Sequence, residues 1–245
     1  MPAADASPVL SVRGLSAGYG ESDIIHDVSF DVGAGETLVI VGPNGHGKST
    51  VLRAISGLIS ASTGEVELDG RRIDGERAEV RSERGLIHIP QGDHLFPELT
   101  VEENLLMGAF PAAAWKRRAG ELDRVYELFP KLRERREQHA RTLSGGERRM
   151  VAVGRGLMRS PRLLVIDEPS LGLAPVIVEA VYETIERIAA QGTSILLVEE
   201  NFTHIEGVAD RVCVLEMGRI VRSGAAAEIA ADATVAQSYL GVLEA

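Results

Sequence analysis

The apolar residues of this chain occur in short runs separated by polar, glycine-containing segments. Residues 163–166, 194–198 and 211–215 form runs of strand length, which are typical of strands buried on both faces of a sheet. Between the first two runs, residues 176–190 repeat apolar positions at helical spacing. This alternation of strand, helix and strand predicts a parallel sheet with crossover helices, and therefore an α/β fold.

Other apolar runs predict antiparallel strands. Residues 9–13 and 25–32 alternate or cluster apolar positions at strand period, and residues 64–70 form a short strand closed by a turn. Near the other end of the chain, residues 216–219 predict a turn between the last two strands, and residues 225–231 a terminal helix.

Residues 113–141 have a helical pattern that is broken at Pro130. They contain nine Lys or Arg against five Asp or Glu, so this segment is basic within an acidic chain. It faces a partner or anionic head groups, or it is simply a solvated helix surface. The charge pattern alone favours the solvated surface.

The composition limits the class of protein. A chain of 245 residues with 44% hydrophobic content can form one sizeable α/β domain or two small ones. Its net charge of −10 argues against nucleic acid as a partner. The single cysteine, Cys213, excludes an internal disulfide and a cysteine-based metal cluster, fits a reducing compartment, and is expected to be a small buried residue.

The sequence contains no targeting or membrane-spanning segment that we recognise. Residues 1–8 lack the basic and apolar regions of a secretory signal and are expected to form a flexible tail. No run approaches the roughly 18 consecutive apolar residues of a membrane span. We therefore expect a cytoplasmic protein whose membrane role, if it has one, is peripheral.

A phosphate-binding loop is the clearest chemical motif. Residues 42–50 match G-x-x-x-x-G-K-[ST] without a mismatch, directly after the apolar run 37–41 and before a helix expected to begin near residue 51. Glycines let consecutive backbone N–H groups face phosphate oxygens, and the following helix directs its positive end at the same anion. We expect Lys48 to reach the β- and γ-phosphates and Ser49 to hold Mg²⁺. The alternative is an ordinary Gly-rich turn between a strand and a helix, but such a turn does not require the full motif in this context. The nucleotide-binding residues predicted here are Gly42, Pro43, Asn44, Gly45, His46, Gly47, Lys48, Ser49 and Thr50.

A second phosphate-chemistry motif is an apolar strand that ends in two acids. The run 163–166 leads into Asp167 and Glu168, about 120 residues after the phosphate loop. Asp167 is expected to bind the metal, directly or through water, and Glu168 to orient and polarise the water that attacks the γ-phosphate. Strands often end in acids, so this motif alone is a weak signal. Downstream of a phosphate loop it indicates an ATPase.

Residues 143–147, Leu-Ser-Gly-Gly-Glu, resemble letter for letter the signature sequence of ABC-type ATPases. Ser144 is expected to cap a helix that begins near Gly146, and Gly145 and Gly146 let the backbone approach a phosphate, with Glu147 completing the motif. The resemblance implies a head-to-tail dimer, in which these residues of one subunit close over ATP held by the phosphate loop of the other.

The same resemblance implies the fold. We expect a P-loop NTPase with an ABC-type nucleotide-binding domain: a mixed core sheet, an antiparallel β subdomain and a helical subdomain. A single domain would span residues 9–243, with the antiparallel and core α/β parts at about 9–90 and 160–243 and the helical subdomain at about 92–159.

Further positions take their roles from the resemblance. It implies that Tyr19 stacks on adenine, the alternative being an ordinary turn tyrosine. It implies that Gln91 contacts Mg²⁺ and the attacking water and relays the ATP state to the membrane partner, a role that suits an amide because it both donates and accepts. Residues 100–105 would then touch the cytoplasmic helix of that partner.

Two positions depart from the ABC pattern. Glu200 stands where a histidine usually contacts the γ-phosphate, and a carboxylate there would repel the phosphate unless it is protonated or unless metal or water intervenes. His204, one helical turn further on, either substitutes for that histidine or is a surface histidine. Residues 170–174 lack the aspartate that is common after the catalytic glutamate.

Residues 96–105, 127–132 and 169–175 resemble the second ATP-binding subunit of branched-chain amino acid importers, in which the histidine position is commonly not histidine. This resemblance implies ATP and Mg²⁺ as cofactors, a second ATPase subunit as dimer partner, and integral membrane permease subunits. Closely similar subunits serve urea and short-amide importers. Two alternatives lie outside transport: an ABC ATPase acting on DNA or ribosomes, and a regulatory module that binds ATP without turnover.

Overall fold

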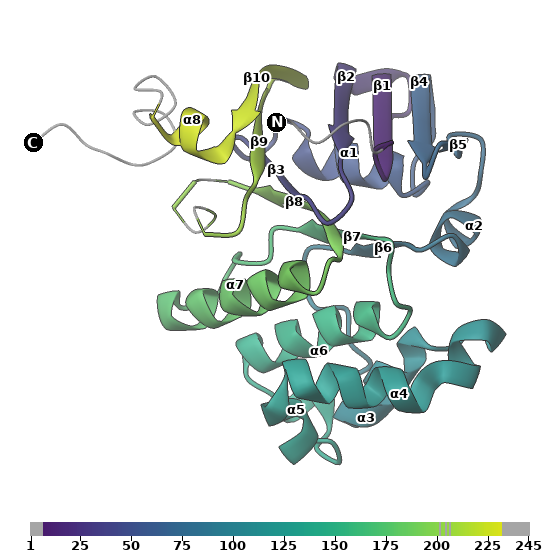
Figure 1. Cartoon of the computed structure of the whole chain (residues 1–245), viewed down its shortest axis with the longest axis vertical. Helices are drawn as coiled ribbons and strands as arrows, with labels where there is room; N and C mark the ends of the chain where they lie inside the picture. The colour runs from purple at the N-terminus through teal and green to yellow at the C-terminus, as the bar shows by residue number, and fades with distance from the viewer. Residues whose placement is uncertain (1–6, 201, 204, 206, 232–245) are drawn as a thin grey trace, which may run out of the picture.

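The computed structural model describes residues 7–200, 202–203, 205 and 207–231 (Figure 1). The strands are β1 Leu10–Tyr19, β2 Ser22–Val32, β3 Thr37–Val41, β4 Ala61–Leu68, β5 Arg71–Arg72, β6 Leu86–Ile89, β7 Leu163–Asp167, β8 Ser194–Glu199, β9 Arg211–Glu216 and β10 Arg219–Ala225. The helices are α1 Lys48–Ile55, α2 Ala78–Glu83, α3 Val101–Gly108, α4 Ala112–Leu128, α5 Pro130–Glu134, α6 Gly145–Leu157, α7 Pro175–Ala190 and α8 Ala226–Ala231, with a 3₁₀ turn at Ala140–Thr142.

The strands form two sheets. A four-stranded antiparallel sheet has the order β2-β1-β4-β5, and a six-stranded sheet has the order β10-β9-β3-β8-β7-β6. In the larger sheet β6, β7, β8, β3 and β9 are parallel, and β10 is added antiparallel at one edge. The predicted parallel sheet with crossover helices is confirmed, as are the antiparallel strands near the start of the chain.

The six-stranded sheet separates two hydrophobic cores. Along β3, Val39 and Val41 belong to one core, whereas Leu38 and Ile40 belong to the other. Successive side chains of a strand point to opposite faces, so a strand buried on both sides must be apolar throughout. The first core is completed by residues of α3 to α8, and the second by residues of α1 and the antiparallel sheet.

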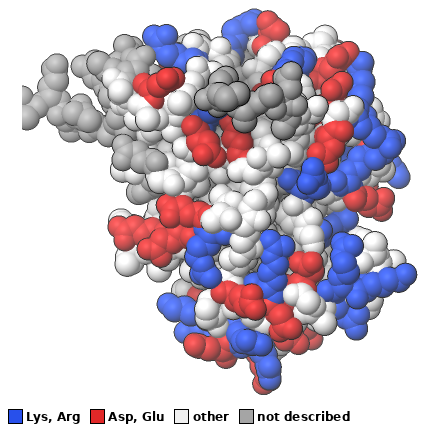
Figure 2. Space-filling model, viewed as in Figure 1, with Lys and Arg blue, Asp and Glu red and all other residues white. Residues whose placement is uncertain are grey.

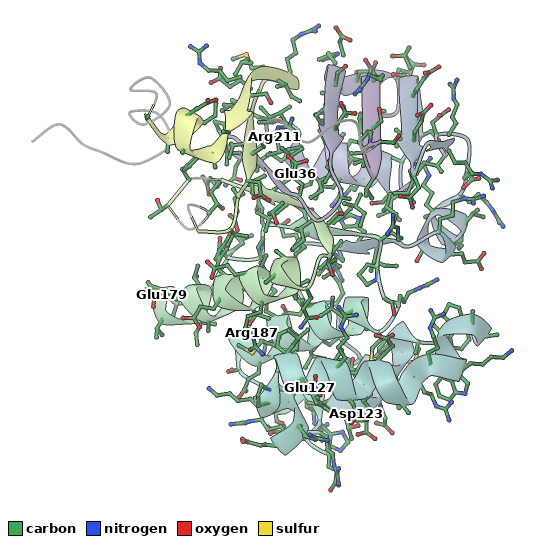
Figure 3. All side chains as sticks on the ribbon, viewed as in Figure 1. Glu36, Asp123, Glu127, Glu179, Arg187 and Arg211 are labelled. Carbon is green, nitrogen blue, oxygen red and sulfur yellow. The ribbon has the colours of Figure 1, made fainter. Side chains whose placement is uncertain are left out.

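Helices α3 to α6 gather at the end of the molecule remote from the antiparallel sheet (Figure 1). The predicted break at Pro130 is present, since α4 ends at Leu128 and α5 starts with the proline, which suits a first helical position. Arg187 of α7 donates hydrogen bonds to the carbonyls of Leu128 (2.9 Å) and Glu127 (2.9 Å) (Figure 3). A cation at these orphan carbonyls stabilises the end of α4 and joins the helical part to α7.

The basic segment 113–141 carries many of its charges in ion pairs. Arg133 pairs with Asp123 (3.4 Å), and both Arg135 and Arg141 pair with acids outside the segment. Figure 2 shows positive and negative side chains interspersed over the lower, helical part of this face. Exposed pairs of this kind contribute little stability, and their presence matches the interpretation of a solvated surface.

Several predicted boundaries were wrong by a few residues. Strand β1 continues to Tyr19 instead of ending at residue 13, because Gly14, with φ of 59°, lets the strand pass through irregular pairing that interrupts its apolar alternation. Helix α1 begins at Lys48, and the α-helical part of the basic segment ends at Glu134, followed by the 3₁₀ turn at Ala140–Thr142. Strand β6 was missed, since His88 interrupts its short apolar run.

Other expectations have simple outcomes. Cys213 is fully buried, as predicted. Among the described residues, the helices include none that is long and apolar enough to cross a membrane. Residues 1–6 of the expected tail, His204 and the residues beyond 231 lie outside the described part of the chain.

Candidate nucleotide-binding site

The candidate site lies at one edge of the six-stranded sheet. Strands β3, β7 and β8 are parallel, so their carboxyl ends meet at the same edge. The pairing places Val41 opposite Glu199 and Asp167 opposite Val198. The phosphate loop that follows β3 and the acids that end β7 are thereby neighbours, although they are far apart in the sequence.

The phosphate loop closes on the start of α1. Gly45 and Gly47 have φ of 81° and 103°, which a side chain would strain. A Cβ on Gly47 would also lie 2.7 Å from the Ile25 side chain. No side chain caps the start of α1. Its first N–H groups and its dipole are therefore free to bind an anion.

Lys48 is buried inside this loop. Its ammonium donates to the carbonyls of Gly42 (2.7 Å) and Pro43 (3.2 Å), and it forms an ion pair with Glu168 (3.2 Å). Both charged side chains are almost completely excluded from solvent. A buried pair with these extra hydrogen bonds holds the ammonium at the centre of the loop, within reach of any phosphate bound there.

Two further hydrogen bonds organise the acids. The Ser49 hydroxyl donates to Asp167 (2.9 Å), and the Gln91 amide donates to Glu168 (3.0 Å). Burial raises the pKa of the Asp167 carboxyl above its ordinary value, the hydrogen bond from Ser49 opposes that shift, and the charge of Glu168 adds to it. Hydroxyl, carboxylate and amide oxygens are the ligands that Mg²⁺ prefers, so this donor set fits that ion.

A pocket of about 280 Å³ opens between these residues. It is lined by Ile24, Asn44, Gly45, Gly47, Lys48, Ser49, Thr50, Gln91 and Glu168. Most of the residues predicted from the phosphate loop and from the strand that ends in two acids are therefore brought together. His46, in contrast, faces the β9–β10 turn: its carbonyl accepts from Gly218 N–H (3.0 Å), and its Nδ1 accepts from Met217 N–H (3.3 Å).

Tyr19 ends strand β1, and its side chain is 46% exposed. Its hydroxyl accepts a hydrogen bond from Arg53 of α1 (2.8 Å). Sequence reasoning missed Arg53, because no motif connects it with a tyrosine 34 residues away. The contact fixes the ring while leaving surface available for stacking.

The signature residues form a capping box at the start of α6. Ser144 accepts from the N–H of Glu147 (3.4 Å), and the Glu147 carboxylate accepts from the N–H of Ser144 (2.9 Å). The predicted cap is confirmed, with the helix beginning at Gly145. Ser144, Gly145, Gly146 and Glu147 are not among the described residues that line the phosphate pocket of their own chain.

The replacement Ser144→Ala removes this cap and is expected to destabilise the chain by about 1 kcal/mol. For a domain of this size, that corresponds to a fall in Tm of roughly 2–4 °C. Thermal unfolding followed by circular dichroism measures the shift. Ser144→Thr keeps the hydroxyl and serves as the control, and an unchanged Tm for the alanine variant would contradict the role of the cap.

Glu199 is a residue of the site that sequence reasoning missed. It is only 4% exposed, and its carboxylate accepts hydrogen bonds from Ser170 and Tyr182. The signal was present, because the apolar run of β8 ends in a carboxylate as the run of β7 does. Its neighbour Glu200, at the position where a histidine is usual, is exposed.

A parallel sheet with a phosphate loop after β3, two acids at the end of β7 and a capped signature helix defines an ABC-type phosphate-loop ATPase. The family model described as ABC transporter matches residues 25–171, and the chain belongs to that family. Its members are ATPases coupled to transport, so the predicted enzyme class is confirmed.

Individual relatives are similar over nearly the whole chain. The chain is 42% identical to the high-affinity branched-chain amino acid transport ATP-binding protein BraG of Pseudomonas aeruginosa, over 95% of this chain and all of that protein. It is 35% identical to the probable branched-chain amino acid transport ATP-binding protein LivF of Archaeoglobus fulgidus, over 94% of this chain and 98% of that protein. The crystal structure of the ADP conformation of MJ1267, an ATP-binding cassette of an ABC transporter, superimposes with a TM-score of 0.83 at 26% identity, covering 96% of this chain and all of the other.

Proposed function

We propose that this chain hydrolyses ATP to drive the uptake of branched-chain or other hydrophobic amino acids through membrane permease subunits, on the inner face of the cell membrane. The observation that carries the proposal is the end-to-end similarity to BraG, joined to a pocket that holds Lys48, Gln91 and Glu168 together. Lys48 would bind phosphate, and Gln91 and Glu168 would orient the attacking water.

The hydrolytic roles follow from the contacts. Ser49, Asp167 and Gln91 would hold Mg²⁺, which when bound neutralises charge on the β- and γ-phosphate oxygens. Lys48, now paired with Glu168 at 3.2 Å, turns to the phosphates when ATP binds. Glu168 is then free to accept a hydrogen bond from the attacking water, and Gln91, already bonded to Glu168, helps to orient that water.

The signature residues act on the ATP of a second ATPase subunit. Ser144 caps α6 and is not among the described residues that line the phosphate pocket of its own chain, and the first N–H groups of a helix have no intrahelical partner and can bind an anion. Two head-to-tail subunits would therefore complete two sites, each with the phosphate loop of one chain and the signature residues of the other.

Tyr19 is proposed to stack on the adenine ring. Tyr19→Ala is expected to lower ATP affinity by about tenfold, since stacking of a base on an aromatic side chain is worth roughly 1–3 kcal/mol. Tyr19→Phe keeps the ring, loses the hydrogen bond with Arg53, and should bind ATP nearly as well as wild type. Titration calorimetry measures both. Equal affinities of the alanine variant and wild type would leave Tyr19 as a turn residue.

The permease is proposed to dock beside β6. Two hollows of about 500 and 400 Å³ share Ser82, His88, Pro90 and Arg159, and Phe96 and Met107 line the second hollow as exposed apolar side chains. Strand β6 runs through this region directly to Gln91, so a helix of the permease bound there can shift Gln91 relative to Glu168.

His88 gives this docking surface a neutral polar group. Neither ring nitrogen has a hydrogen-bond partner within the described part of the chain. Burial lowers the pKa of the ring to about 4, with the nearby charge of Arg53 adding to the shift, so the ring is uncharged at neutral pH. An unpaired buried imidazole is costly, and a polar group of the permease would satisfy it if docking opens this region to expose the ring.

Steady-state phosphate release tests the enzymatic part of the proposal. The purified chain is assayed with ATP and Mg²⁺, alone and with its sister ATPase subunit. Turnover that requires Mg²⁺ supports the proposal. Binding of ATP without turnover in either setting would favour the regulatory module instead.

A further inference from the structure

Glu199 ends strand β8 with a buried carboxylate that the chemistry above does not use. Its Oε1 accepts hydrogen bonds from the N–H of Ser170 (3.1 Å) and the hydroxyl of Tyr182 (2.6 Å). Its Oε2 accepts from the Ser170 hydroxyl (3.0 Å) and from the N–H of Glu200 (3.3 Å). Burying a carboxylate is costly unless it is hydrogen-bonded, so four donors make this side chain a specific anchor.

Glu199 is bonded to both halves of the candidate site. Its main-chain carbonyl accepts from the N–H of Gly42, the first residue of the phosphate loop (3.3 Å). Its side chain holds Ser170, two residues after Glu168. A single residue therefore links the phosphate loop to the segment that follows Glu168.

That segment determines the direction of Glu168. Glu168 has φ of 45°, in the left-handed region that non-glycine residues rarely adopt. Its N–H donates to the carbonyl of Val198 (3.1 Å), and its carbonyl accepts from the N–H of Leu171 (3.3 Å), which makes a tight turn. A strained conformation persists only where its surroundings impose it. Ser170 is the third residue of this turn, and its two bonds to Glu199 on β8 help to hold the turn in place.

The same segment reaches the signature helix. The N–H of Leu173 donates to the carbonyl of Ser170 (3.2 Å). A Cβ built on Gly145 would lie 3.4 Å from the Leu173 side chain, so Leu173 lies close to the start of α6. Ser170 is thus held by Glu199, and through Leu173 it is linked to the signature residues at the start of α6.

Tyr182 of α7 fixes the carboxylate itself. Burial raises the pKa of the Tyr182 phenol far above its ordinary value, and the charge of Glu199 adds to the shift. The phenol therefore stays protonated and remains a donor. Since α7 begins at Pro175, directly after the segment 170–174, the same helix that carries Tyr182 also holds the end of that segment.

We propose that Glu199 is a positioning residue for ATP hydrolysis, whose carboxylate orients Glu168 by holding Ser170. The proposal rests on the proposed hydrolytic role of Glu168. Glu199 itself neither gains nor loses a proton or a bond during turnover. Weakening the anchor should therefore lower the rate of hydrolysis and leave ATP binding, which depends on the phosphate loop, unchanged.

The first test compares Glu199→Gln with wild type. The amide keeps the size of the side chain but places a donor where Oε2 accepts from two groups, so Ser170 is held less firmly. We expect kcat to fall by about 10- to 100-fold, as small misplacements of catalytic groups do, with the KM for ATP within about twofold of wild type. Glu179→Gln, the same change on the exposed face of α7 (Figure 3), is the control.

Variants of Ser170, the residue that Glu199 holds, provide a second test if Glu199→Gln fails to fold. Ser170→Ala deletes one hydrogen bond and should lower kcat with little change in KM, whereas Ser170→Thr keeps a hydroxyl and should restore kcat. A merely structural role predicts a loss of Tm without a separation of kcat from KM.

A double-mutant cycle separates this proposal from the role of Glu168. If Glu199 acts through Glu168, then Glu199→Gln has no further effect on single-turnover hydrolysis once Glu168→Gln is present. Wild-type kcat for Glu199→Gln and Ser170→Ala, or full additivity in the cycle, would overturn the positioning role while leaving the role of Glu168 intact. Wild-type turnover by Glu168→Gln alone would instead overturn the proposed hydrolytic role of Glu168.

Discussion

Replacing Glu168 by Gln is expected to lower the rate of ATP hydrolysis by about 10²- to 10⁴-fold, the usual contribution of a group that takes a proton in the transition state. Glutamine has the same size, and its carbonyl oxygen can still accept from Lys48 or Gln91. It cannot act as a base. ATP should therefore bind and close the dimer, but it should not be hydrolysed.

Phosphate release and light scattering test this expectation together. The Glu168→Gln variant should form an ATP-dependent dimer that persists, whereas the wild-type dimer dissociates as ATP is consumed. Glu179→Gln, on the exposed face of α7, should behave as wild type. Hydrolysis by Glu168→Gln at the wild-type rate would remove Glu168 from the reaction.

Lys48→Ala is expected to cause the second large loss. Its ammonium makes charged hydrogen bonds to Gly42 and Pro43 and pairs with Glu168. With ATP bound, the same ammonium would face the phosphates, where charged hydrogen bonds are worth about 1.5–3 kcal/mol each. We expect ATP affinity to fall by at least about 10- to 100-fold, and turnover with it.

This variant should also destabilise the chain without nucleotide. Glu168 is 6% exposed, and removing Lys48 leaves it without the one cation that pairs with it in the described structure. An unpaired buried charge is strongly destabilising. Calorimetric ATP titration and thermal unfolding measure the two effects. Lys116→Ala, on the exposed face of α4, is the control. Wild-type ATP affinity in Lys48→Ala would contradict the assignment of the phosphate loop.

The parts of the molecule that the sequence predicted well depend on local patterns. The central strands β3, β7, β8 and β9 of the large sheet contain continuous apolar runs because both faces are buried, and the phosphate loop needs its glycines for backbone reasons alone. The Ser144 cap spans only four residues. Each of these features produces a pattern in consecutive residues, and each was predicted from that pattern.

The parts that were missed depend on contacts between distant segments. Arg53 reaches Tyr19 only because α1 packs beneath β1, and Glu199 meets Ser170 only because β8 lies beside β7. The left-handed conformation of Glu168 has no local signal, since its neighbours Asp167 and Pro169 do not require it. These features belong to tertiary structure and need the fold before they can be seen.

The two departures from the ABC pattern now have a structural setting. Glu200, in place of the usual histidine, is exposed and can be hydrated in the free chain. The segment 170–174 lacks an aspartate but is anchored through Ser170 to Glu199. The bonds between Ser170 and Glu199 therefore hold this segment in place, although the usual aspartate is absent from it.

If this chain powers amino acid uptake, transport must depend on its hydrolysis of ATP. The chain is reconstituted with its permease and sister ATPase subunits in proteoliposomes, and entry of labelled leucine is followed with ATP and Mg²⁺ at the face exposed to the ATPase. We predict uptake that requires ATP, is lost with Glu168→Gln, and is not inhibited by urea or short amides. ATP-driven movement of urea or short amides without leucine, or hydrolysis without any transport, would contradict the claim.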